Sequence, residues 1–119
     1  NCAPVIEADP VHGTFGAKYV NQGMLDGELD IVSARILFTM NAKHLAWSFD
    51  VTPATSDTVA AGQTTQVTHT KTDGTGVGDD PSLDPCDFCS GTAKIEITWK
   101  AKQLQQTGEK SLGLVQCTK

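Results

Sequence analysis

The sequence predicts an all-β protein: a single antiparallel β-sandwich domain over residues 1–119 with about seven to eight strands. Three observations lead to this prediction. Apolar and polar residues alternate strictly in two segments, several short apolar segments are separated by turn-forming residues, and the evidence for helices is poor. A small β-barrel is the alternative that the same pattern allows.

The clearest alternation lies in residues 45–51 and 93–100. Successive side chains of a β-strand point to opposite faces, so residues two apart share a face. The side chains expected to face a core are those of Leu45, Trp47, Phe49, Val51, Ile95, Ile97 and Trp99. Those expected to face water are the intervening Ser48, Asp50, Lys94, Glu96 and Lys100.

Three further segments complete the central part of the prediction. Residues 36–40 form a continuous apolar run, which favours a central strand, and residues 41–43 would turn into the strand that begins near Leu45. Residues 64–70 are rich in threonine, so we expect an edge strand with Val67 facing inward.

The strands near the chain ends are less regular. Weaker strands are expected over residues 5–7, 15–20 and 29–33, and a terminal strand over residues 112–118. The terminal strand would pair with residues 93–100, with the chain bending at residues 107–109.

Helix formation is disfavoured where the chain is long enough for it. Residues 18–37 could span a helix, but Gly23 and Gly27 interrupt them. Each glycine costs about 1 kcal/mol relative to alanine in a helix interior. The segment is therefore expected to be extended.

Residues 51–64 carry Pro53, Val59, Gly62 and Gln63 in this order. This stretch resembles the segment that turns between strands in bacterial immunoglobulin-like surface modules. The resemblance implies an immunoglobulin-like sandwich in an extracellular setting. The chain departs from antibody-type domains because no cysteines flank the Trp47 strand at the spacing of an inter-sheet disulfide.

The four cysteines, Cys2, Cys86, Cys89 and Cys117, point to disulfides. Their number is even, and the chain starts without methionine, as a secreted protein does after its leader is removed. We expect pairs Cys2–Cys117 and Cys86–Cys89, and the alternative links the 86–89 segment to both chain ends. A zinc site would need a second close cysteine pair, and none is present.

Residues 71–87 form the most distinctive loop, with five aspartates among glycines and prolines. Carboxylates that converge in such a loop suit a hard cation such as calcium, so Asp73, Asp79, Asp80 and Asp84 are candidate ligands. The alternative is a solvated loop rich in turn-forming residues. No other cofactor is expected, and either version makes this loop a candidate contact region.

Charge and motifs exclude several classes of function. The net charge is −5 and the chain has one arginine, Arg35, which disfavours nucleic acid as a partner. No apolar run approaches the roughly 18 residues of a membrane span, so membrane insertion is not expected. No nucleophile elbow is present, and cysteines held in disulfides could not act as nucleophiles. We therefore expect no enzymatic activity.

These observations predict a non-catalytic secreted or cell-surface module that acts as a structural or adhesive subunit, in one version within a fibre or pilus. Its partners would be a protein or glycan at the extracellular surface, or further copies of itself. The alternative is a secreted soluble binder: a carbohydrate-binding module, an inhibitor or an effector. Trp47 and Trp99 would serve the carbohydrate version if exposed, but their alternation with aliphatic residues favours the core.

Overall fold

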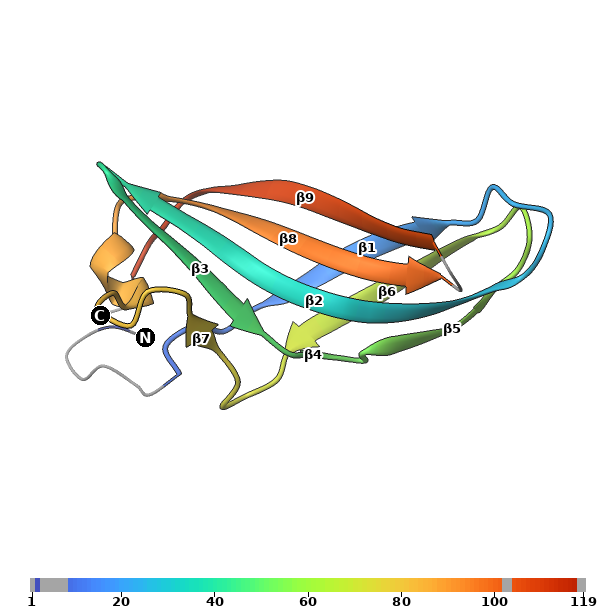
Figure 1. Cartoon of the computed structure of the whole chain (residues 1–119), viewed down its shortest axis with the longest axis horizontal. Coiled ribbons are helices and arrows are strands. Elements are labelled where there is room, and N and C mark those ends of the chain that lie inside the picture. Colours follow the sequence, from blue (N-terminus) through green and yellow to red (C-terminus); the bar gives the residue numbers. More distant parts are fainter. Residues whose placement is uncertain (1, 3–8, 102–103, 118–119) are drawn as a thin grey trace.

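The structure is a computed structural model that describes residues 2, 9–101 and 104–117. Within these residues nine strands pair antiparallel in two sheets, so the predicted all-β sandwich is confirmed and the sheets do not close into a barrel (Figure 1). The strand expected over residues 5–7 lies outside the described residues.

The strands are β1 (Thr14–Val20), β2 (Gly27–Met40), β3 (Lys43–Phe49), β4 (Val51–Thr52), β5 (Thr55–Val59), β6 (Thr64–Lys71), β7 (Val77–Gly78), β8 (Thr92–Ala101) and β9 (Leu104–Leu114). One 3₁₀ turn, η1 (Pro85–Phe88), precedes β8. The small sheet has the order β1-β6-β4. The large sheet has the order β7-β3-β2-β8-β9, and β5 also pairs with β2.

The sandwich is elongated, with extents of 51 × 26 × 22 Å. Figure 1 shows β1 and β6 behind the large sheet. The loop between β1 and β2 lies at one end of the long axis, and η1 lies at the other. Two hollows of the surface lie near these two ends.

The alternation predicted for β3 and β8 is confirmed. Leu45, Trp47 and Phe49 are at most 8% exposed, and Ile95 and Ile97 are equally buried. Val51 is also buried, but it belongs to β4 in the small sheet, because the chain changes sheets after Phe49. The period-two pattern therefore placed the side chains correctly even where it ran across a sheet change.

The predicted strands over residues 29–33 and 36–40 are one continuous strand, β2. A β-bulge between Ile31 and Ser33 shifts the register against β8, and this allows the long strand to curve. The turn into β3 is two residues long, and its first residue, Asn41, has a φ of 55°. Asparagine tolerates this left-handed conformation better than most residues do.

The bend predicted at residues 107–109 is wrong, because these residues lie inside the continuous strand β9. Gly108 pairs with Ile97, and a Cβ at Gly108 would come within 3.1 Å of the Trp99 ring. The glycine thus makes room for an aromatic ring on the neighbouring strand. A glycine in a strand interior often marks such a close approach rather than a turn.

The strand predicted over residues 64–70 is β6, extended by one residue to Lys71. It pairs with β1 along residues 64–70, and on its other side it pairs with β4 only at Thr70 and Lys71. β6 is thus the middle strand of the small sheet and not the predicted edge strand, although most of its second side has no strand partner among the described residues. The main buried side chain of β6 is His69, with Val67 only partly buried.

Two apolar clusters fill the space between the sheets. The main cluster includes Trp47, Ile95 and the fully buried Phe88 of η1, whose ring lies 5.7 Å from that of Phe38. A second cluster of Tyr19, Leu29 and Val59 fills the end near the loop between β1 and β2. Because the first cluster includes η1, this short turn closes the other end of the core.

All four cysteines form disulfides, as predicted, but the favoured pairing is wrong. The pairs are Cys2–Cys86 and Cys89–Cys117, which is the alternative that links the 86–89 segment to both chain ends. The pairing follows from contacts between segments that are distant in the sequence. Two backbone hydrogen bonds, Ser90 N to Val115 O and Val115 N to Gly91 O, hold the segment before Cys117 beside the segment after Cys89.

Trp47 provides a test of how tightly the large sheet is covered. A Cβ added at Gly76 would come within 2.3 Å of the indole Nε1 of Trp47, and Gly76 has a φ of 153°. We expect Gly76→Ala to lower the free energy of unfolding by about 1–3 kcal/mol through overpacking and backbone strain. Urea unfolding followed by tryptophan fluorescence measures this change.

Gly13→Ala is the matched control, because no atom lies within 4 Å of a Cβ built at Gly13. Its effect on stability should stay within about 0.5 kcal/mol. Equal losses in the two variants would show that Gly76 does not pack on the indole.

Candidate functional site

The acidic loop between β6 and β8 runs past the edge of the large sheet. Its middle forms β7, which pairs with Trp47 and Ser48 of β3, and its end forms η1. Cys86 and Cys89 tie this end of the loop to the two terminal segments of the chain. The loop is therefore built into the sandwich at both its middle and its end.

The four candidate calcium ligands lie apart along the loop, and each has its own surroundings. Asp79 Oδ1 accepts from the backbone N–H of Ala46, and Asp84 Oδ1 accepts from that of Cys86 at the start of η1. Asp80 Oδ1 accepts from the hydroxyl and the N–H of Ser82, which lower the pKa of Asp80. Asp73 is 94% exposed.

The structure does not bring these carboxylates together. Among the described residues, one group offers three or more potential metal ligand atoms within 4.8 Å of one another, and it consists of Cys2, Cys89 and Cys117. These sulfurs are held in disulfides. Asp80 and Asp84 thus cap backbone turns, and Asp79 ties the loop to β3. Calcium binding by Asp73, Asp79, Asp80 and Asp84 stays a prediction without a preformed cage.

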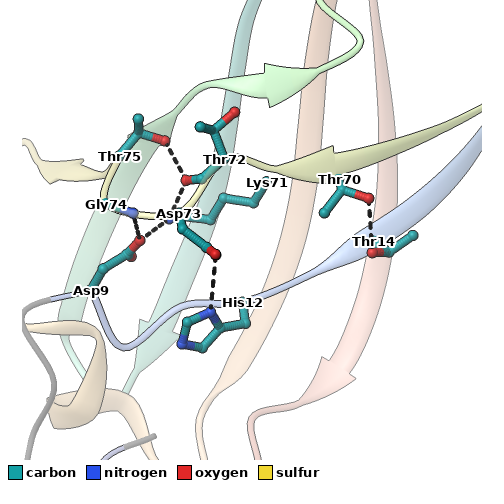
Figure 2. Close-up of polar contacts among 9 residues, drawn as sticks. All are labelled: Asp9, His12, Thr14, Thr70, Lys71, Thr72, Asp73, Gly74 and Thr75. Carbon is teal, nitrogen blue, oxygen red and sulfur yellow. Dashed lines mark hydrogen bonds and ion pairs between the residues drawn. The ribbon is translucent and has the colours of Figure 1, made fainter.

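A buried ion pair fixes the start of the loop, as Figure 2 shows. The Lys71 ammonium donates to Asp9 Oδ2 at 2.5 Å, and the two side chains are 3% and 15% exposed. The N–H of Gly74 donates to the same oxygen at 2.8 Å. Asp9 precedes β1, so this contact joins the N-terminal segment to the end of β6.

Burial would raise the pKa of Asp9, but the opposing effects are stronger. The hydrogen bonds from Lys71 and Gly74, and the charges of Lys71 and His12, hold the pKa of Asp9 below its ordinary value. The second carboxylate oxygen, Oδ1, is buried and has no hydrogen-bond partner. Breaking the pair would leave a buried charge with still less compensation.

The histidines are not a metal site, and one of them is part of the core. His69 is fully buried, which the sequence did not predict. Each of its two ring nitrogens forms one hydrogen bond. Nδ1 lies 2.8 Å from the Pro53 carbonyl oxygen, and Nε2 lies 2.9 Å from the Tyr19 hydroxyl. Because a carbonyl oxygen only accepts, Nδ1 donates to Pro53, and Nε2 shares a hydrogen bond with the Tyr19 hydroxyl.

A large hollow, here called the wide hollow, opens where β1 ends and where β8 and β9 meet. Its volume is about 780 Å³. Apolar side chains that line it include Tyr19, Met24, Leu25, Leu29, Trp99 and Leu104. A volume of this size is in the range of small-ligand and peptide pockets.

Aromatic rings form one wall of the wide hollow. The rings of Trp99 and Tyr19 meet edge to face with their centroids 5.7 Å apart, and Trp99 is only partly buried. The sequence analysis placed Trp99 in the core. The structure places it at the core boundary, because the small sheet does not extend far enough to cover β9 and this end of β8.

The loop over residues 21–26, here called the tip loop, carries apolar side chains into solvent. Met24 is 94% exposed and Leu25 is 72% exposed. The Asn21 amide holds the loop in shape, because it donates to Leu25 O and Val59 O and accepts from the N–H of Gly23. Asp26 fixes the loop's end by accepting from the N–H of Ala61.

A smaller hollow, here called the narrow hollow, lies toward the η1 end and has a volume of about 350 Å³. Its lining includes Val11, Ile36, Phe38, Leu112, Leu114 and Val115. Leu112 and Leu114 are 49% and 68% exposed. Both hollows therefore lie on the side of the sandwich where β1 and β9 are the outer strands.

The sequence analysis ranked the acidic loop first and did not single out the tip loop or the hollows. A signal for the tip loop was present, because Met24 and Leu25 stand between Gly23 and Gly27 in an otherwise polar stretch. Apolar residues at a turn between strands have no core to face. The hollows had no such signal, because they depend on which strands end up at the edges of the two sheets.

The Lys71–Asp9 pair gives a direct stability test. Lys71→Met should lower the free energy of unfolding by about 3–5 kcal/mol, because Asp9 would keep its charge in a buried site without its partner. Thermal or urea unfolding measures the loss. The control, Lys18→Met, removes an exposed lysine of β1 and should change stability by less than about 0.5 kcal/mol.

The lowered pKa of Asp9 predicts how stability changes in acid. A carboxyl group whose pKa is lower in the folded than in the unfolded state binds fewer protons when folded, so stability rises with pH. The contribution is complete above the unfolded pKa of about 3.9 and is lost as the pH falls through the lower folded value. Asp9→Asn should flatten this part of the stability curve below about pH 4. Identical curves for both proteins would contradict the role given to Asp9.

No known protein family, curated protein or solved structure matches this chain. In the part of the chain that the structure describes, no helix has the length and apolar character needed to cross a membrane.

Proposed function

We propose that this chain is a non-catalytic, secreted or cell-surface module that acts as a structural or adhesive subunit. Its two disulfides support an oxidising compartment, since such bonds persist mainly outside the cytosol. The resemblance of residues 51–64 to bacterial immunoglobulin-like surface modules supports the same setting. The function would then reside in contacts with other molecules rather than in a reaction.

The observation that carries the proposal is the grouping of exposed apolar side chains at the two hollows. Val20, Met24, Leu25 and Leu104 are each at least 59% exposed and all line the wide hollow. Leu112 and Leu114 line the narrow hollow. Isolated exposed apolar residues are ordinary on a protein surface, but contiguous groups of them indicate interaction sites.

The open strand edges support the version in which the chain is a fibre or pilus subunit. Among the described residues, β1 pairs only with β6, and β9 pairs only with β8. Unpaired strand edges can accept a strand from another chain. The inner face of β9 also lies beyond the small sheet, so an added strand beside β1 would cover it.

The wide hollow favours a second candidate, a secreted soluble binder of carbohydrate or protein. Its aromatic wall of Trp99 and Tyr19 resembles the platforms on which sugar rings stack. Against the carbohydrate version, the Tyr19 hydroxyl and the Asn21 amide are already hydrogen-bonded within the protein. The lining thus offers more apolar surface than uncommitted polar groups, which suits a protein surface better.

Assembly and adhesion can be measured together on the full chain. We expect sedimentation velocity to show association that grows with protein concentration, or surface plasmon resonance to show binding to immobilised extracellular proteins. Leu104→Asp at the wide hollow should weaken binding to an immobilised extracellular protein by about tenfold or more, since it places a charge in an apolar contact.

Val32→Asp is the matched control, because Val32 is 52% exposed and lines neither hollow. A chain that stays monomeric and binds no protein, yet binds defined sugars on a glycan array, would replace the proposal with the soluble-binder alternative. Detection of hydrolysis of a glycan or peptide substrate would contradict the non-catalytic part.

A further inference from the structure

We propose that copies of this chain assemble head to tail, with the tip loop of one copy seated in the narrow hollow of the next. This inference rests on the proposed function and deepens it, because it names the partner as a second copy and assigns the two surfaces. The shapes of the tip and the hollow, their charges and their positions on the molecule support this assembly.

The tip loop is a preorganised protrusion. Met24 and Leu25 extend into solvent, while Asn21 fixes the loop through three hydrogen bonds of 2.8–2.9 Å. A loop that is already ordered loses little conformational entropy when it binds. Burying two large apolar side chains then favours association, and ordering of the loop adds little to the translational and rotational entropy that is lost.

The narrow hollow is a mostly apolar recess beside both disulfides. Its floor is formed by inward-facing side chains of β2 and β8, such as Ile36 and Ala93, and its rim by Leu112 and Leu114 of β9. Both disulfides contribute a cysteine to its lining, Cys2 and Cys117. These crosslinks join the segments that border the recess, which favours a docking site for an ordered loop.

The charges beside the two surfaces are opposite in sign. Asp26 and Glu28 flank the tip and are exposed. Lys110 is exposed on β9 and lies opposite Ile95, which itself pairs with Ile36 of the narrow hollow. Directly opposed residues share a face of the sheet, so Lys110 stands on the inner face beside the hollow.

The same charges disfavour a symmetric contact between two tips. A two-fold axis at the tip would bring Asp26 and Glu28 of both copies together, and like charges in contact oppose association. Seating the tip in the narrow hollow brings these carboxylates toward Lys110 instead. Charge therefore selects the contact between unlike ends.

The positions of the two surfaces make the contact an open one. The tip loop and the η1 end lie at opposite ends of the 51 Å long axis (Figure 1). A contact between different surfaces at opposite ends does not close after two copies and generates a filament. The expected axial repeat is close to the 51 Å length of the domain.

Two variants, each damaged at one end, test the inference. The tip variant carries Met24→Asp with Leu25→Asp, and the hollow variant carries Leu114→Asp. All three side chains are at least 68% exposed, so folding should be retained, which circular dichroism and thermal unfolding check. Wild-type protein should form concentration-dependent oligomers in sedimentation velocity, and each variant alone should associate at least about 100-fold more weakly.

Mixing the variants is the decisive measurement. Each retains one intact surface, so an equimolar mixture should form one-to-one heterodimers and nothing larger. A hollow variant that still forms dimers while the tip variant does not would assign a symmetric tip contact and overturn the inference. Val32→Asp, which alters neither surface, should assemble as the wild type does.

Other outcomes separate this inference from the proposed function. A wild type that adheres to other extracellular proteins but stays monomeric would overturn head-to-tail assembly and leave the proposed function intact. Binding of the wild type, and not the tip variant, to phosphatidylcholine vesicles would assign the tip to a lipid surface and also overturn it. A wild type that shows no self-association and no adhesion to other proteins would contradict both proposals.

Discussion

The small sheet is narrower than the large sheet that it covers, and the surface of this protein follows from that mismatch. The three strands of the small sheet pack over an inner face formed by five neighbouring strands, in the spatial order β7-β3-β2-β8-β9. The inner faces of β3, β2 and most of β8 are covered and form the core. The inner face of β9 is left over, and its leucines and the neighbouring Trp99 stay accessible. Both hollows lie along this uncovered side.

The polar groups, by contrast, are largely committed to holding the fold. Asp9 and Lys71 join the segment before β1 to the end of β6, Asp79 joins the acidic loop to β3, and Asp80 and Asp84 cap backbone turns. A carboxylate that accepts a backbone N–H satisfies a group that would otherwise be unpaired. The hydrogen bonds of the acidic loop thus explain why most of its aspartates are present. The exposed apolar side chains, by contrast, have no role in packing the core.

The proposed role as an interaction module draws on these two features. Exposed apolar side chains at both ends of an elongated, crosslinked sandwich suit repeated contacts along one axis, because a rigid subunit transmits position from one contact to the next. The tip loop and the narrow hollow differ in shape and in charge, as the two surfaces of a head-to-tail contact do. Tyr19 and His69, buried beside the wide hollow, support that end of the domain through their shared hydrogen bond.

The residue pattern was enough to predict the side-chain alternation of β3 and β8, the sandwich class and the commitment of all four cysteines to disulfides. The first two depend on local periodicity, which each strand carries within its own residues, and the third on the even number of cysteines. The three-dimensional arrangement was needed for the pairing Cys2–Cys86 with Cys89–Cys117, the continuous course of β9 through Gly108, and the burial of His69 and Lys71. Each of these depends on which distant segment lies alongside, and a single strand's pattern does not encode its neighbour. The hollows belong to the same group, because they exist where a neighbouring strand is missing.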